Sequence, residues 1–266
     1  MTASSCMRPI PMTLQVVQTG RLDEFGRQPE RVASRELGLY EATSGVFSAR
    51  RVKTGRQWGI SEIFSNRDAR FTCIYVLDGY AVLRLSDRLV TLHRHDSICQ
   101  VPFSATSIAE VSLDFEFVEI QVLDTPLASE VLPGPGESRE LVSFDTPDAH
   151  VRGAGPRAFF DYRNLGLADI TGRRIEVQVI RAQQAREGGT GWHSHTMAQL
   201  SYGLSGWALL DIEGVKEPVR QQPGDAICIP AGCGHNAGSF SSDYWALQLQ
   251  IPVDYDTTPM DTPVRR

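Results

Sequence analysis

The sequence predicts an all-β fold of two tandem jelly-roll barrels. Three observations predict it: the 266-residue chain repeats itself at about half its length, short runs of β-branched and aromatic residues alternate with glycine and proline turns, and no long segment follows a helical period. Many short strands of this kind are typical of a sandwich or barrel. We therefore expect helix to be a minor component.

The repeat has an offset close to 128 residues. Arg35–Thr43 matches Arg163–Thr171 with five of nine positions identical, and Asp114–Val122 matches Asp243–Ile251. Asp114–Val122 and Asp243–Ile251 each have the alternating pattern of a strand, and each is the last strand of its unit. Ordered matches at one offset indicate two homologous units. Two shorter matches, Ile74–Gly79 with Ser201–Gly206 and Asp96–Cys99 with Asp225–Cys228, keep the offset within one residue.

The expected strands follow the same order in both units. Each is a short run rich in β-branched and aromatic residues, and glycines such as Gly79, Gly206 and Gly214 mark the turns between them. The expected strands are Val46–Val52, Cys73–Leu77 and Tyr80–Leu85 in the first unit, and Ile175–Ile180, Trp207–Ile212 and Ala246–Ile251 in the second.

A segment rich in proline and glycine separates the two units. Its densest part is Pro133–Gly136, and such a composition interrupts regular structure. We therefore expect an N-terminal domain at residues 1–125, a linker at 126–156 and a C-terminal domain at 157–266.

Composition excludes several classes of protein. The net charge of −6 repels a phosphate backbone, which argues against nucleic acid as a partner. The longest apolar runs are far shorter than the roughly 20 residues that span a bilayer. Residues 1–12 lack the pattern of a secretory signal. The five cysteines include no CxxC pair, so we expect reduced thiols and a cytoplasmic protein.

The second unit contains donors with the spacing of a metal site. His193, His195 and Gln199 have equal parity, so on an extended strand their side chains project to one side. His235 follows a proline and glycine turn that would return it on a neighbouring strand. Three imidazoles and an amide are therefore expected to hold one divalent ion. Because an amide oxygen is a weaker donor than a carboxylate, the alternative for Gln199 is a hydrogen bond to a metal-bound water.

These residues resemble the two motifs of the cupin superfamily. The first motif, HxH, then three or four residues, an acidic residue, six residues and glycine, fits His193, His195, Gln199 and Gly206. The second, glycine, five residues, PxG, two residues and histidine, fits Gly224–His235. The chain departs from the family in three places: Gln199 replaces glutamate, Gly188 or Gly189 is out of register, and Ser239 replaces asparagine.

The resemblance implies a bicupin, with a double-stranded β-helix barrel in each half and one ion of iron, manganese, nickel or zinc in the second. The first unit is expected to bind no metal, because the positions equivalent to the four donors hold other residues. The sequence His93-Arg94-His95 is expected to be a solvated turn, since it aligns with a turn of the second unit. The four equivalent positions are Asn66, Asp68, Thr72 and Ser107.

Three neutral imidazoles and a neutral amide leave the ion its full double charge, which favours an anionic, chelating substrate. We expect an oxidoreductase, a dioxygenase that acts with dioxygen on a small enolic, diketone or phenolic compound. Two alternatives stay open: an isomerase, lyase or cyclase that uses the ion as a Lewis acid, and a binding protein without turnover. Nothing in the sequence identifies a general base or any other catalytic residue.

Other side chains belong to the pocket or the core. Met197 and Ser201 share the parity of the ligands and are expected to line the substrate pocket. Trp192, Trp207 and Trp245 either shape that pocket or fill the core, and core is favoured. Exposed sheet edges favour a homodimer. Cys233 is expected to be a core or loop residue, although a thiolate would bind zinc.

Overall fold

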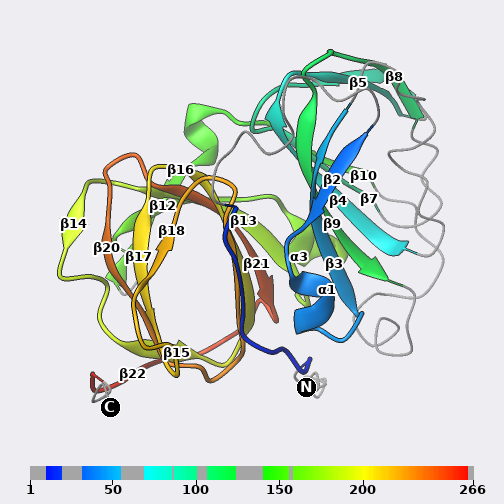
Figure 1. The fold of residues 1–266 in the computed structure, drawn as a ribbon. Coiled ribbons are helices and arrows are strands. Elements are labelled where there is room, and N and C mark those ends of the chain that lie inside the picture. The colour runs from blue at the N-terminus through cyan, green and yellow to red at the C-terminus, as the bar shows by residue number, and fades with distance from the viewer. Residues whose placement is uncertain are drawn as a thin grey trace, which may run out of the picture.

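The computed structural model describes residues 10–19, 32–54, 69–85, 87–100, 107–123, 140–155 and 158–262. Strand accounts for 53% of these described residues and helix for 6%, and the strands form two barrels, which confirms the predicted fold class (Figure 1). The described helical segments are two α-helices and one 3₁₀ segment, and none has the length and apolar character needed to cross a membrane. They are α1 (Leu39–Ala42), η3 (Pro147–Ala149) and α3 (Leu167–Ile170).

The first barrel, blue to green in Figure 1, consists of two antiparallel sheets. One has six strands in the order β10-β7-β4-β9-β3-β2, and the other has three in the order β6-β5-β8. The strands are β2 (Ala33–Glu36), β3 (Phe47–Lys53), β4 (Ala69–Asp78), β5 (Ala81–Arg84), β6 (Leu89–Leu92), β7 (Ser97–Gln100), β8 (Ser107–Val111), β9 (Glu116–Leu123) and β10 (Glu140–Ser143).

The second barrel, green to red in Figure 1 except for the blue strand β1, repeats this plan. Its seven-stranded sheet has the order β1-β19-β16-β21-β13-β12-β11, and the facing sheet has the order β18-β17-β20-β15-β22, with β14 also paired to β20. The strands are β1 (Gln15–Val17), β11 (Val151–Arg152), β12 (Phe160–Asn164), β13 (Glu176–Ala182), β14 (Arg186–Glu187), β15 (His193–His195), β16 (Ala198–Ser205), β17 (Ala208–Ile212), β18 (Val219–Gln221), β19 (Ala226–Ile229), β20 (His235–Phe240), β21 (Trp245–Ile251) and β22 (Thr257–Pro259).

The repeated sequence around Arg35 and Arg163 forms the same local structure twice. Helices α1 and α3 each follow a glycine with positive φ, 78° at Gly38 and 85° at Gly166. The hydroxyls of Thr43 and Thr171 each donate to a helix carbonyl four residues earlier, at 2.8 Å in both cases. Each hydroxyl also accepts the amide four residues later. The sequence repeat is thus a repeat of hydrogen bonds.

The two halves exchange edge strands. Strand β1 begins the chain but pairs with β19 of the second barrel, and β10, which follows the first unit, pairs with β7 of the first. The same anchor follows each strand: Thr19 donates its amide to Asp225 at 2.6 Å, and Asp145 donates its amide to Asp96 at 2.8 Å. Each larger sheet therefore has one edge strand that comes from a distant segment of the chain: β1 in the second barrel and β10 in the first.

The expected domain boundaries stay a prediction. Residues 124–139, which include most of the Pro/Gly-rich segment, lie outside the described part of the chain. The remainder of the expected linker at 126–156 is partly regular, because it contains β10, η3 and β11.

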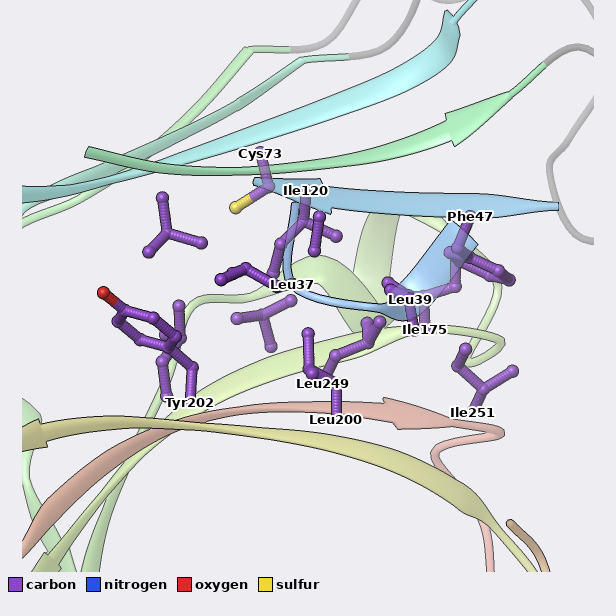
Figure 2. Packing of buried hydrophobic residues seen from close by; sticks show 14 of the residues in the cluster. Leu37, Leu39, Phe47, Cys73, Ile120, Ile175, Leu200, Tyr202, Leu249 and Ile251 are labelled. Atoms are coloured by element: carbon purple, nitrogen blue, oxygen red, sulfur yellow. The ribbon is translucent and has the colours of Figure 1, made fainter. Parts of the chain in front are cut away.

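The larger sheets of the two barrels pack face to face across the middle of the molecule. One cluster of buried hydrophobic residues extends over both, and Figure 2 shows its side chains meeting between the sheets. The opposite face of the seven-stranded sheet is therefore turned toward the interior of the second barrel. Labelled members are Leu37, Leu39, Phe47, Cys73 and Ile120 from the first half and Ile175, Leu200, Tyr202, Leu249 and Ile251 from the second.

The turn between β16 and β17 requires glycine for two reasons. Gly206 has φ of +61°, and a Cβ there would contact Ser241 and lie 2.7 Å from the Tyr244 amide nitrogen. Gly214 also has positive φ, +81°, but no atom lies within 4 Å of its Cβ position. We expect Gly206→Ala to lower the free energy of unfolding by about 3 kcal/mol and Gly214→Ala by about 1 kcal/mol. Urea unfolding measures both, and equal losses would contradict the steric contribution.

Candidate metal centre

Three histidines meet inside the second barrel. His193 and His195 lie on β15, and His235 begins β20, where it is the register partner of His193. One ring nitrogen of each lies within 4.8 Å of the others. In the described part of the chain no other group of three histidine, cysteine or acidic residues approaches this closely. The strand pairing thus brings together residues about forty positions apart in sequence.

Hydrogen bonds at Nδ1 orient all three rings. The Nδ1 atom of His193 lies 2.7 Å from the carbonyl oxygen of Gly191, and that of His235 lies 3.0 Å from the carbonyl oxygen of Cys233. A carbonyl only accepts, so each Nδ1 carries the proton and each Nε2 keeps its lone pair. The Nδ1 atom of His195 lies 2.9 Å from the Thr257 hydroxyl, with which it forms a hydrogen bond. Metal-binding histidines are commonly held by such bonds.

Gln199 lies beside His235 but comes from the other sheet, on strand β16. Its side chain is buried, and its amide nitrogen lies 3.2 Å from Nε2 of His235. Rotation of the amide by 180° would exchange its nitrogen and oxygen. Two ligands about 2.1 Å from one ion and at right angles to each other are about 3 Å apart. The spacing of Gln199 and His235 therefore fits two ligands of one ion.

The cluster is electrically suited to a cation. Burial, with a smaller contribution from nearby His193, lowers the pKa of His235 to about 4, although the hydrogen bond to the Cys233 carbonyl opposes the shift. His235 is therefore neutral at physiological pH and has no proton for a metal to displace. The Cys233 thiol is half-buried and lies 3.8 Å from the carbonyl oxygen of Gly234, and it is not part of the histidine cluster.

The cluster borders a cavity of about 700 Å³ in the second barrel. Met197, Ser201 and Trp192 line it, together with Gln199 and the three histidines. Aromatic side chains from strand β12 and from loops, together with glutamines of the seven-stranded sheet, form much of the remaining wall. They include Phe159, Phe160, Tyr162, Tyr244 and Tyr255, and Gln178, Gln248 and Gln250.

Trp207 and Trp245 lie outside this lining. The Trp207 ring packs against the Arg220 guanidinium, 4.5 Å from the ring centre. Trp245 packs between the halves, with its ring centre 4.9 Å from the Arg181 guanidinium and 5.2 Å from the His95 ring. In both cases a guanidinium covers the ring face, so each tryptophan has a packing partner within the protein.

The turn at His93-Arg94-His95 is solvated only in part. His93 and Arg94 are exposed, whereas His95 is half-buried against Trp245. Its Nδ1 atom lies 3.0 Å from the Tyr75 hydroxyl, and burial lowers its pKa. The expectation of a solvated turn is thus wrong for His95, because the second barrel covers this turn.

Two of the four positions equivalent to the donors can be located in the first barrel. Thr72 lies on β4 and Ser107 begins β8, where it is exposed. Asn66 and Asp68 lie outside the described residues.

The carboxyl-terminal segment contributes two residues that the sequence pattern did not indicate. Strand β22 pairs with β15, with Thr257 opposite His195. The Tyr255 ring lies at 78° to the His195 ring, with centres 5.2 Å apart, and lines the cavity. No local motif marks either residue, because their role depends on a strand pairing across about sixty positions.

Thr257 supplies a testable contact to the cluster. We expect Thr257→Val to weaken metal affinity about tenfold, because His195 loses the hydroxyl that holds its ring, whereas Thr257→Ser retains it. Competition with a chromophoric chelator measures the affinity. Thr258→Val, at the next exposed position of β22, is the matched control, and a loss equal to that of Thr257→Val would contradict the role of the hydroxyl.

Comparison with known proteins identifies the fold. No family model matches the chain, and no curated protein sequence matches it. Among solved structures, the putative glyoxylate-induced protein of Pseudomonas aeruginosa has a TM-score of 0.63 at 12% identity, covering 88% of this chain and 84% of its own. Protein Ylba of E. coli has a TM-score of 0.58 at 11% identity, covering 98% and 97%.

The oxalate decarboxylase of Bacillus subtilis, which has Mn(II) centres, is similar over 88% of this chain and 76% of its own, with a TM-score of 0.57 and 12% identity. At such identities the likeness concerns the fold alone. The neighbours are cupin-fold proteins, and the fold agrees with the resemblance in the two motifs. The chain therefore has the two-barrel cupin fold.

Proposed function

We propose that the chain is a metal-dependent dioxygenase that acts on a small enolic, diketone or phenolic chelate. One divalent ion of iron, manganese, nickel or zinc would be held by His193, His195, His235 and Gln199. The observation that carries the proposal is the common orientation of the three imidazoles, each held at Nδ1 beside a cavity of about 700 Å³. The Mn(II) centres of the oxalate decarboxylase support a metal in this fold.

Each part of the site has a role in this function. When bound, the ion would supply Lewis acidity toward two substrate oxygens and, if redox-active, electron transfer to dioxygen. The aromatic side chains of the wall pack against the substrate and exclude water. The glutamine amides hydrogen-bond to substrate oxygens and orient the chelate.

The charges of the cavity favour oxidation over isomerisation. An isomerase or lyase needs a base that moves a proton. Among the described residues that line the cavity, the only carboxylate is Asp254. It is exposed and hydrogen-bonded to Arg173, whose hydrogen bond lowers the Asp254 pKa and makes the carboxylate a weaker base. Among the described residues, the cavity lining therefore contains no strong carboxylate base that could take a proton from a chelating substrate.

Oxygen consumption tests the proposal. Iron-loaded protein is mixed with acetylacetone, catechol and related chelates, and dioxygen uptake is followed together with product formation. Uptake matched to product supports the dioxygenase. Turnover under strict anaerobiosis contradicts it and supports the isomerase or lyase. Tight binding of a chelate without turnover in either condition supports a binding protein, and absence of bound metal after purification and reloading contradicts the site itself.

A further inference from the structure

The cavity face of the seven-stranded sheet carries a grid of uncharged polar side chains. Across β13, β21 and β16 the register places Gln178 opposite Gln248 and Gln248 opposite Ser201. One step along the strands, Gln250 is opposite Gln199, the amide beside His235. On its other side Gln250 is opposite Glu176, which does not line the cavity and whose carboxylate accepts the amides of Leu167 and Ala168. Directly opposed side chains in a sheet have Cβ atoms about 5 Å apart. The grid therefore begins at the donor cluster and continues into the cavity.

This surface contains almost no formal charge. The described residues that line the cavity include no lysine or arginine, and their one carboxylate, Asp254, is ion-paired with Arg173 on an exposed part of the surface. A carboxylate or phosphate carried by a ligand away from the ion would lose its hydration and find no cation.

The fold does not require this neutrality. In the first barrel, Arg50 and Glu119 are opposed on β3 and β9, as Gln178 and Gln248 are on β13 and β21. Arg50 and Glu119 form an ion pair, whereas the Gln178 amide donates to the Gln248 carbonyl at 3.1 Å. One sheet position thus accommodates either charges or amides, so the amides of the second barrel reflect what its cavity holds.

Gln250 marks where a ligand would bind. Its side chain is only 4% exposed, borders the cavity and forms no hydrogen bond within the described residues. The described residues thus leave the hydrogen-bonding capacity of this amide, at the cavity wall, unused. A carbonyl or hydroxyl of a ligand chelated beside Gln199 would satisfy it.

We infer that the substrate is a bidentate enolic or phenolic chelate whose remaining part is uncharged, with carbonyl, hydroxyl or aromatic groups and no second carboxylate or phosphate. The inference rests on the proposed metal site. The chelating oxygens supply the negative charge that the ion requires, and the amide grid recognises the neutral remainder.

Two catechols, one with a neutral and one with a charged substituent, test the inference. Protein loaded with Co²⁺ is titrated anaerobically with 4-methylcatechol and with 3,4-dihydroxybenzoate, and calorimetry gives both dissociation constants. We expect 4-methylcatechol to bind at least about tenfold more tightly, because the carboxylate would be buried without a cation. Equal or tighter binding of the benzoate overturns the inference, as does failure of the Co²⁺ protein to bind either catechol.

Substitutions at the grid sharpen the test. Gln178→Arg is expected to improve 3,4-dihydroxybenzoate binding about tenfold while 4-methylcatechol is little changed, because the guanidinium supplies the missing cation. The double variant Gln178→Arg with Gln248→Glu reproduces the ion pair of the first barrel and is expected to restore the wild-type preference. Gln222→Arg, at an exposed position, is the matched control. An unchanged preference in Gln178→Arg contradicts the role of the grid.

Metal content, measured first in every protein, separates the two proposals. A variant or wild-type chain that binds no Co²⁺ argues against the metal site, whereas full Co²⁺ occupancy with a preference for the benzoate argues against the substrate class alone.

Discussion

His235→Ala is expected to lower metal affinity by at least about a hundredfold. Removal of a partner that only orients a metal ligand costs about 10–100-fold in affinity, and removal of the ligand itself costs more. His235 is the donor that the fold holds most rigidly, because it is buried, lies opposite His193 in the sheet and contacts Gln199. Elemental analysis after dialysis against a weak chelator measures the loss, and His193→Ala should behave similarly.

His93→Ala is the control for that experiment. His93 belongs to the other HxH sequence of the chain but is exposed in a turn of the first barrel, so its removal is expected to leave metal content unchanged. Retention of metal by His235→Ala would contradict the ligand assignment. Two ions per wild-type chain would contradict the expectation that the first unit binds none.

The donors of the candidate site could be predicted from sequence because their geometry is local. Parity along one strand groups His193 and His195 on β15, and the turn before His235 fixes where the next strand begins. The expectation that Gln199 shares that strand is wrong, because Gln199 lies on β16 of the seven-stranded sheet. Thr257 and Tyr255 could not be predicted in this way. Their place beside His195 results from the pairing of β22 with β15, and a short exposed strand contains no pattern that specifies its partner.

In the fold, too, local structure could be predicted from the sequence, whereas pairing between distant strands could not. The repeat predicted two barrels because Arg35–Thr43 and Arg163–Thr171 encode their own turns and helix ends. The exchange of β1 and β10 was not predictable. The strands have three and four residues, and pairing energy, not periodicity, determines which sheet edge each one covers.

Trp245 and His95 show a third feature that the sequence alone could not predict, the contact between the two barrels. An aromatic residue on an alternating strand is equally consistent with a pocket wall and with a contact between barrels. The packing of the two large sheets decides it, since that packing brings the turn of the first barrel onto β21 of the second.

Leu200→Ala is expected to lower the free energy of unfolding of the whole chain by about 2–5 kcal/mol. Leu200 is 1% exposed and belongs to the cluster that both large sheets share, as Figure 2 shows, so its truncation leaves a cavity that neither barrel fills alone. Because the cluster and the exchanged strands join the halves, the loss should extend to the first barrel. Urea unfolding measures the total, and hydrogen exchange at the β4 amides of Cys73 and Tyr75 reports on the first half.

Leu89→Ala provides the control, since Leu89 is 56% exposed on β6 and its truncation is expected to change stability by no more than about 0.5 kcal/mol. If Leu200→Ala accelerates exchange only in the second barrel, the halves unfold independently and the shared cluster does not couple them. Acceleration at Cys73 and Tyr75 by a factor that matches the total loss means that the two barrels unfold as one unit. In that case the barrel without the histidine cluster stabilises the barrel that contains it.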